Sequence, residues 1–195
     1  MSKVEPDSHK KERNKTIRWV SIIFLVTIVV SGLISFISEE IMASTGIVFA
    51  FIILLCIVLL GIVFDIIGVA VTSADEKPFH SMASRKVPGA LEAIRLLRNA
   101  ERVSSICNDV VGDICGVVSG SASATIAAQI LVHFEFSVPN VLTLVMSALV
   151  SGLTVGGKAI GKTFAMNSST QILHAVGRFI RFIHNIPKIF RKKNK

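Results

Sequence analysis

Four long runs of apolar residues dominate the chain, and short polar segments separate them. No ionisable side chain lies between Trp19 and Ser38, and residues 41–64 form a longer uncharged run. Two further runs cover residues 114–132 and 136–157. Each run exceeds roughly 18 residues, the length at which a membrane span is favoured over a buried helix of a soluble protein. The pattern predicts an all-α integral membrane protein with four transmembrane helices.

The polar segments between these runs divide the chain into regions. We expect spans at about 17–38, 41–72, 103–133 and 137–163, within a transmembrane domain of residues 17–165. A basic tail, a helical hairpin, and an amphipathic juxtamembrane helix with a basic end complete the chain at 1–16, 75–102 and 166–195. The first run is too long for the apolar region of a signal peptide, so we expect it to be retained as a span.

Charge predicts the orientation of the spans. The formal net charge is +8, and Lys and Arg gather in three segments, residues 1–18, 77–102 and 178–195. The expected short connections between spans carry only acids, Glu39, Glu40 and Glu135. Four spans place all three basic segments on one side, which the positive-inside rule identifies as the cytoplasm. We therefore expect both termini in the cytoplasm, in a plasma membrane or a bacterial inner membrane.

Two segments outside the spans have helical periodicity. Pro88 and Gly89 precede ALEAIRLLRNAERV, in which apolar residues recur at helical spacing. In residues 172–185, apolar and basic side chains fall on different helical faces, which is typical of a helix lying in the membrane interface. The basic end RKKNK is expected to attract anionic lipid, a partner that we favour over nucleic acid.

The most informative residues are polar side chains inside the apolar runs. They are Asp65 near the end of the second span and Asn108, Asp109 and Asp113 at the start of the third. A carboxylate at membrane depth costs roughly 2.5–3.5 kcal/mol on insertion scales, so it usually faces a protein interior, a water-filled cavity or an ion. Asp109 and Asp113 share a helical face, and with a third carboxylate and further oxygens they would suit a hard cation such as Mg²⁺.

Lysines at the end of the fourth span offer an alternative to an ion. Lys158 and Lys162 are expected to enter the same layer as the acids. They would then act as internal counter-ions in a salt-bridge network, and the protein would be a scaffold or regulator that transports nothing. The residues alone leave both interpretations open.

Small residues recur every four positions in the last two spans. Gly112, Gly116 and Gly120 lie on the third, and the pairs Gly152 with Gly156 and Gly157 with Gly161 lie on the fourth. Such spacing lets membrane helices approach closely. We expect a homodimer, although the spacing itself does not choose between packing within one chain and packing between two.

No residue pattern predicts an enzyme. Residues 156–163, GGKAIGKT, match the phosphate-loop pattern, but they follow a membrane span instead of a buried strand. The five histidines are dispersed, with no nucleophile or metal ligand at a telling spacing. The three cysteines lie in apolar segments and predict neither a disulfide nor a zinc site.

From about Asp65 onward, roughly the last two thirds of the chain, the sequence resembles the transmembrane domain of the CNNM/CorC magnesium-transporter family. The run IGVAVTS is similar to the family's SEIALFS, and MASRKVPGALEAIRLLRNAER is similar to LAEEGDRRAKRVLELLENPER. The run VSSICNDVVGDICG stands where the family has a span containing GN and LVN. Finally, GKAIGKTFA resembles GEILPKTLA and precedes an amphipathic helix, as in the family.

The resemblance implies a Mg²⁺-handling membrane protein with one extra N-terminal span. It also implies changed chemistry, because the family's glutamates align with Gly68 and Lys158. In exchange, Asp65 aligns near a family serine, and Asn108, Asp109 and Asp113 stand where the family has other polar residues. The cytosolic CBS domains of larger members have no counterpart in these 195 residues.

Overall fold

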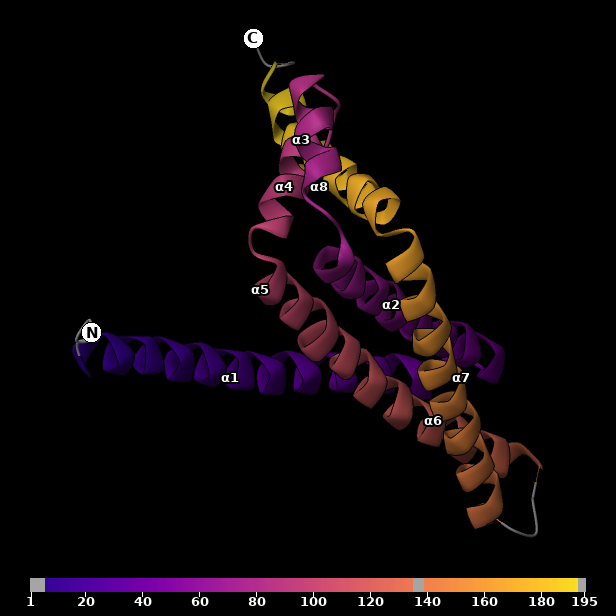
Figure 1. Ribbon diagram of the computed structural model, residues 1–195. Coiled ribbons are helices and arrows are strands. Elements are labelled where there is room, and N and C mark those ends of the chain that lie inside the picture. The colour runs from indigo at the N-terminus through magenta and orange to yellow at the C-terminus, as the bar shows by residue number, and fades with distance from the viewer. Residues whose placement is uncertain (1–5, 135–138, 193–195) are drawn as a thin grey trace.

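The computed structural model describes residues 6–134 and 139–192, and every element in these ranges is a helix (Figure 1). The four longest of the apolar helices are α1 (Pro6–Ser44), α2 (Ile47–Ser73), α6 (Asp113–Phe134) and α7 (Pro139–Asn167). The remaining elements are α3 (Lys77–Ser84), α4 (Ala90–Leu97), α5 (Ala100–Ser105), the π-helix η1 (Ile106–Gly112) and α8 (Ser169–Lys192). Because α5, η1 and α6 follow one another without a break, they act as a single long helix.

Four helical segments are long and apolar enough to cross a bilayer. They are Ile17–Met42, Ile47–Ser73, Ala100–Val132 and Val141–Asn167. This confirms the prediction of an all-helical, multi-pass membrane protein with four candidate spans. The side of the membrane on which the termini lie stays a prediction.

The connection between the first two spans lies later in the chain than the acids indicated. Glu39 and Glu40 belong to the last two turns of α1, and the break falls at Thr45 and Gly46. Glutamate is a good helix former, whereas glycine is a poor one, and Gly46 adopts an extended conformation. Glu135 and the side chains of residues 1–16 and 186–195 lie outside the described residues.

Helix α2 is the central element of the bundle. It packs against α6, η1 and α7, while α1 packs mainly against α6. The buried apolar core combines residues of all four long helices, namely Met42, Ala50, Leu54, Val58, Ala122, Ile126 and Val150. The spans therefore form one bundle with α2 at its centre.

Helix α1 packs mainly on α6, through a stripe of half-buried residues that runs from Trp19 to Met42. None of its most apolar window is buried, and Figure 1 shows it extending away from the other helices. At one end, Gln129 Nε2 donates a hydrogen bond of 2.6 Å to the carbonyl oxygen of Met42. At the other, the Arg102 guanidinium lies 5.6 Å from the centroid of the Trp19 ring, within cation–π range. Most of the apolar surface of α1 is thus left for lipid.

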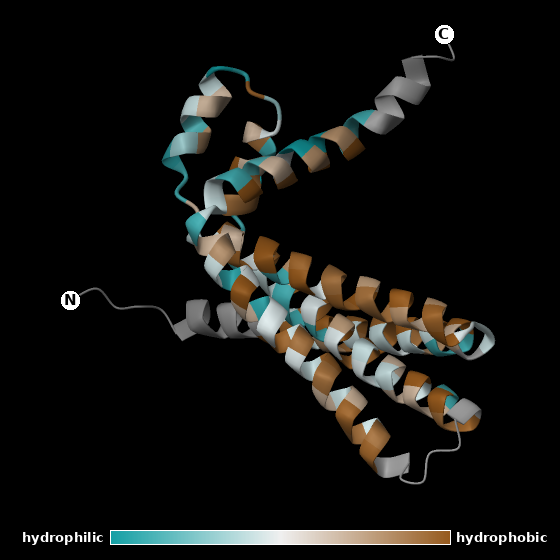
Figure 2. Cartoon of the chain, turned by 90° about the vertical axis from the view of Figure 1, so that its right-hand side faces the viewer, coloured by the Kyte–Doolittle hydropathy of each residue, from teal (hydrophilic) through white to brown (hydrophobic). Residues whose placement is uncertain are grey.

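The short helices gather at one end of the bundle, which we call the α8 end. Their core joins α2, α3, α4 and α8 through Val71, Phe79, Ala93, Ile94 and Leu173. Gly89 has φ +91° and its oxygen lies against Gly177, so both positions require glycine for the close approach of α4 and α8. Figure 2 shows α8 turning away from the long helices at this end.

Candidate functional site: a polar layer between α2, η1 and α7

Polar side chains of three helices meet near the α8 end of the bundle. We call this set the polar layer, and it consists of Asp65 on α2, Asn108 and Gly112 on η1, and Lys158 and Lys162 on α7. On α7 the two lysines are one helical turn apart, so they reach the layer from the same face. The layer is thus built by three helices that are far apart in the sequence.

Asp65 is the most deeply buried charged group of the layer. Its relative exposure is 4%. The Lys162 ammonium lies 4.0 Å from Asp65 Oδ2, the outer limit of an ion pair. Within the described part of the chain, that oxygen accepts no hydrogen bond. Because the Lys162 side chain is 54% exposed, its charge is screened by solvent and compensates the carboxylate only weakly.

Asn108 places a second acceptor oxygen beside the same helix. A Cβ added at Gly68 would collide with Asn108 Oδ1, so the amide lies directly against the α2 backbone. Asn108 Nδ2 donates a 3.3 Å hydrogen bond to Ser104 Oγ, while Oδ1 is buried and has no hydrogen-bond partner among the described residues. Asp65 and Gly68 are three residues apart and share a face of α2. One acceptor oxygen without a hydrogen bond thus belongs to this face of α2, and a second packs against it.

Lys158 binds to the backbone instead of an acid. Its Nζ donates a 3.3 Å hydrogen bond to the carbonyl oxygen of Gly112, the last residue of η1. A π-helix shifts the backbone pairing by one residue, and such turns often occur at functional sites. The ammonium thus sits at the junction of η1 and α6.

The other two predicted acids lie outside the polar layer. Asp109 and Asp113 are exposed. Ser105 Oγ donates a 2.6 Å hydrogen bond to Asp109 Oδ2. Among the described residues, no group of three or more His, Cys, Asp or Glu side chains could hold a metal ion. The structure therefore brings Asp65 and Asn108 to one interface and leaves Asp109 and Asp113 apart from it, so the four-residue metal site stays a prediction.

The glycines of α7 divide into two groups. A Cβ at Gly161 would lie 2.8 Å from Ile66 Cγ1, and one at Gly157 would collide with Ile62. Around Gly152 and Gly156, in contrast, no atom lies within 4 Å of the added Cβ, and the same is true of two glycines of α6, Gly116 and Gly120. The predicted packing positions that meet neighbours are therefore Gly157, Gly161 and Gly112, where an added Cβ would lie 3.3 Å from Lys158 Nζ. The phosphate-loop look-alike, residues 156–163, is helical throughout, and its close contacts belong to the packing of α7 against α2 and η1.

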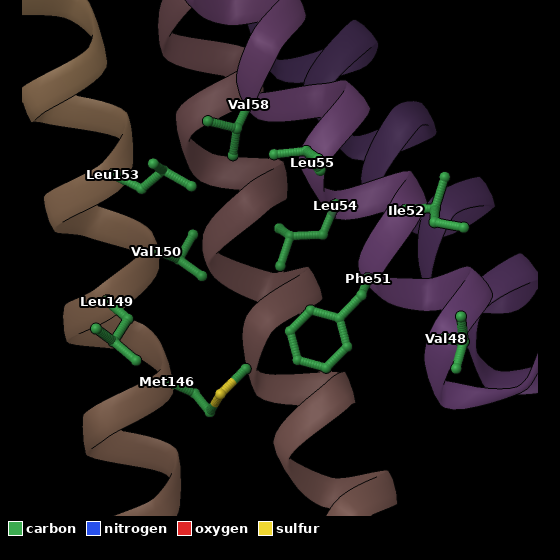
Figure 3. A pocket seen from close by; sticks show the side chains of 10 residues that line it. All are labelled: Val48, Phe51, Ile52, Leu54, Leu55, Val58, Met146, Leu149, Val150 and Leu153. Carbon is green, nitrogen blue, oxygen red and sulfur yellow. The ribbon is translucent and has the colours of Figure 1, made fainter.

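Beyond these contacts, α7 is flanked by two clefts. The apolar cleft, of about 480 Å³, lies between α2 and α7. Figure 3 shows its side chains facing each other across the gap; they include Phe51, Leu54, Val58, Met146, Leu149 and Leu153. The polar cleft, of about 450 Å³, lies between α6 and α7, and its lining includes Asp113, Gly116, Ser119, Ser151, Thr154 and Lys158. Three valines, Val117, Val150 and Val155, complete the polar cleft together with Gly112 and Gly120.

The sequence contains a signal for the α7 wall of this polar cleft. Ser151, Thr154 and Lys158 are spaced three and four residues apart and therefore share one helical face. The role of Gly68, which makes room for Asn108, had no comparable signal, because it depends on a contact between distant helices.

Helix α8 presents three different faces. Leu173 and Gly177 pack in the core with α4, and His174 Nε2 lies 3.2 Å from the carbonyl oxygen of Pro88. Phe179 and Phe182 are exposed and apolar. A helix with a docked face and a free apolar face is compatible with the predicted position at the membrane surface, which stays a prediction.

Comparison of the chain with protein-family models, with curated proteins and with solved structures finds no match in any of the three. The features of the molecule that bear on function are therefore the polar layer and the clefts beside it.

Proposed function

We propose that the chain is a transporter-like membrane protein that binds a divalent cation such as Mg²⁺ at the polar layer. The observation that carries the proposal is the pair of buried acceptor oxygens, Asp65 Oδ2 and Asn108 Oδ1, that accept no hydrogen bond within the described residues. A buried acceptor without a partner is costly, and most of all when it is charged. Carboxylate and amide oxygens are ligands that Mg²⁺ accepts, with water completing its shell.

Lys162 is the competitor in this scheme. Its ammonium is the positive charge next to Asp65, yet it stands at 4.0 Å and is half exposed. An ammonium in this position can move into solvent when a cation arrives, because its stem is flexible and its head is already hydrated. When no cation is bound, the Lys162 ammonium therefore supplies the positive charge next to Asp65.

A second candidate function rests on the lysines themselves. Lys158 is bound to the Gly112 carbonyl and Lys162 is paired with Asp65, so both ammoniums are placed to replace a metal permanently. The protein would then be a non-transporting scaffold or regulator of a partner. This alternative predicts that Mg²⁺ has no effect on the parent protein.

Thermal unfolding across a Mg²⁺ titration separates the two functions. A ligand that binds the native state at 100 times its dissociation constant stabilises it by about 2.7 kcal/mol. We expect a saturable rise in the melting temperature of the purified protein, abolished in Asp65→Asn and shifted to lower Mg²⁺ concentration in Lys162→Met. Asp109→Asn, which changes an exposed carboxylate, is the matched control and should respond as the parent does. If the melting temperature of the parent protein does not change with Mg²⁺, the result contradicts the cation proposal and favours the scaffold alternative.

A further inference from the structure

We propose that the polar cleft between α6 and α7 is a water-filled path through which a hydrated cation reaches the polar layer. The inference rests on the cation function proposed above, which it deepens by naming the route. It starts from a contrast between the two flanks of α7: apolar side chains alone line one cleft, whereas three hydroxyls and two charged groups join valines and glycines in the lining of the other.

Charge at membrane depth is the first argument. Asp113 and Lys158 both line the polar cleft, and both belong to candidate membrane spans. Facing acyl chains, each would cost roughly 2.5–3.5 kcal/mol, whereas water in the cleft removes most of that cost. The cleft volume of about 450 Å³ has room for on the order of ten waters.

The hydroxyl groups supply the second argument. Ser119 Oγ donates a 2.9 Å hydrogen bond to the Gly116 carbonyl, and Thr154 Oγ1 donates one of 2.8 Å to the Val150 carbonyl. Each hydroxyl proton is thus used within its own helix, which leaves the oxygen lone pairs as acceptors. Oxygens that act as acceptors suit a cation and the water around it.

The position of the cleft gives the direction of the path. It extends along α6 from Gly112 to Gly120, eight residues or about 12 Å of helix, away from the α8 end. At its inner end stands Lys158, held by the Gly112 carbonyl. A cation that moves along the cleft therefore meets this ammonium before it reaches Asp65, so displacement of Lys158 is a step of the proposed path.

Cysteine accessibility tests the path without relying on cation binding. The background is a variant in which Cys56, Cys107 and Cys115 are replaced by alanine and whose melting temperature has been compared with that of the parent. Ser151→Cys and Thr154→Cys place thiols in the polar cleft. Leu149→Cys and Leu153→Cys place thiols in the apolar cleft at matching depth on the same helix.

The measurement is the rate at which a charged, membrane-impermeant thiosulfonate labels each thiol in the protein reconstituted in lipid nanodiscs. We expect the two polar-cleft thiols to react at least about tenfold faster, because a charged reagent enters hydrocarbon only at high cost. Equal rates on both flanks, or protection of Ser151→Cys by a disulfide to a second chain, would overturn the path. Since labelling needs no Mg²⁺ site, this result and the Mg²⁺ titration can fail independently.

Discussion

The two halves of α7 differ in how firmly they are held. At the α8 end, Gly157 and Gly161 press against isoleucines of α2, and Lys158 and Lys162 reach partners on η1 and α2. In the half before Gly156, α7 stands between two clefts, and Gly152 has no neighbour within 4 Å of an added Cβ. The comparison indicates a helix that is anchored at one end and, apart from the buried Val150, loosely packed along the other.

This difference has a consequence for the proposed function. Transport requires that a path be opened and closed, and regions with few packed contacts are the ones that move at low cost. The anchored half of α7 holds the charged groups, while the loosely packed half forms the walls of the clefts. We therefore expect motion of α7 to change the cleft volumes more than the geometry of the polar layer.

The largest expected effect is a clash at the anchored half. Gly161→Leu places a side chain against Ile66. Because isoleucine is β-branched, its side chain has little freedom to move aside. We expect a loss of about 3 kcal/mol in stability, the upper part of the usual range for overpacking. Heating the protein with a thiol-reactive dye that detects the buried Cys107 and Cys115 measures this loss.

Gly156→Leu is the matched control for that variant. It makes the same change on α7 where no atom lies within 4 Å of an added Cβ, so we expect the melting temperature of the parent. Equal losses in the two variants would mean that the changed lipid contact, and not the α2–α7 contact, determines the effect.

A smaller effect is expected from the ion pair between α2 and α7. Lys162→Met leaves the buried Asp65 carboxylate without its counter-ion. A fully buried broken pair costs about 3–5 kcal/mol, but because Lys162 is half exposed we expect about 1–2 kcal/mol. Urea or thermal unfolding of the variant without added Mg²⁺ checks this value.

The double variant with Asp65→Asn provides the control, because a neutral amide needs no counter-ion. We expect it to regain most of the stability lost in Lys162→Met, which a double-mutant cycle would record as coupling. Strictly additive losses would mean that the two groups do not interact.

The smallest effect is expected in the loosely packed half. Leu149→Ala removes a side chain that is 64% exposed at the apolar cleft, so it creates no enclosed cavity. We expect a change within about 0.5 kcal/mol in detergent. Leu54→Ala, on the buried side of the same cleft, should lose about 2–5 kcal/mol in the same assay. A large loss in Leu149→Ala would show that this half of α7 is packed after all.

Local patterns predicted most of the secondary structure. The uncharged runs predicted four apolar helices, and Pro88 with Gly89 predicted the start of the helix that begins at Ala90. The prediction of one connection at Glu39 and Glu40 was wrong, because a charged residue indicates polarity and not the end of a helix. The break at Gly46 followed from backbone preference instead.

Contacts between distant helices were not predictable in the same way. Seven glycines had the spacing of close packing, and among the described residues only Gly112, Gly157 and Gly161 of these meet a neighbour within 4 Å of an added Cβ. A period of four residues shows which glycines share a helical face and does not show what that face meets. Similarly, Asp109 and Asp113 share a face, yet it is Asp65 and Asn108 that are brought to one interface.

The sequence by itself determined that this is a helical, multi-pass membrane protein with charged groups inside its spans, because hydropathy and charge act residue by residue. Only the tertiary structure decided which charges meet. The orientation of α7 about its own axis brings Lys162 to Asp65 and Lys158 to the Gly112 carbonyl. The same orientation places the hydroxyls of Ser151 and Thr154 in the polar cleft. These contacts depend on how glycines and isoleucines of different helices pack together, and local patterns along the sequence do not show that packing.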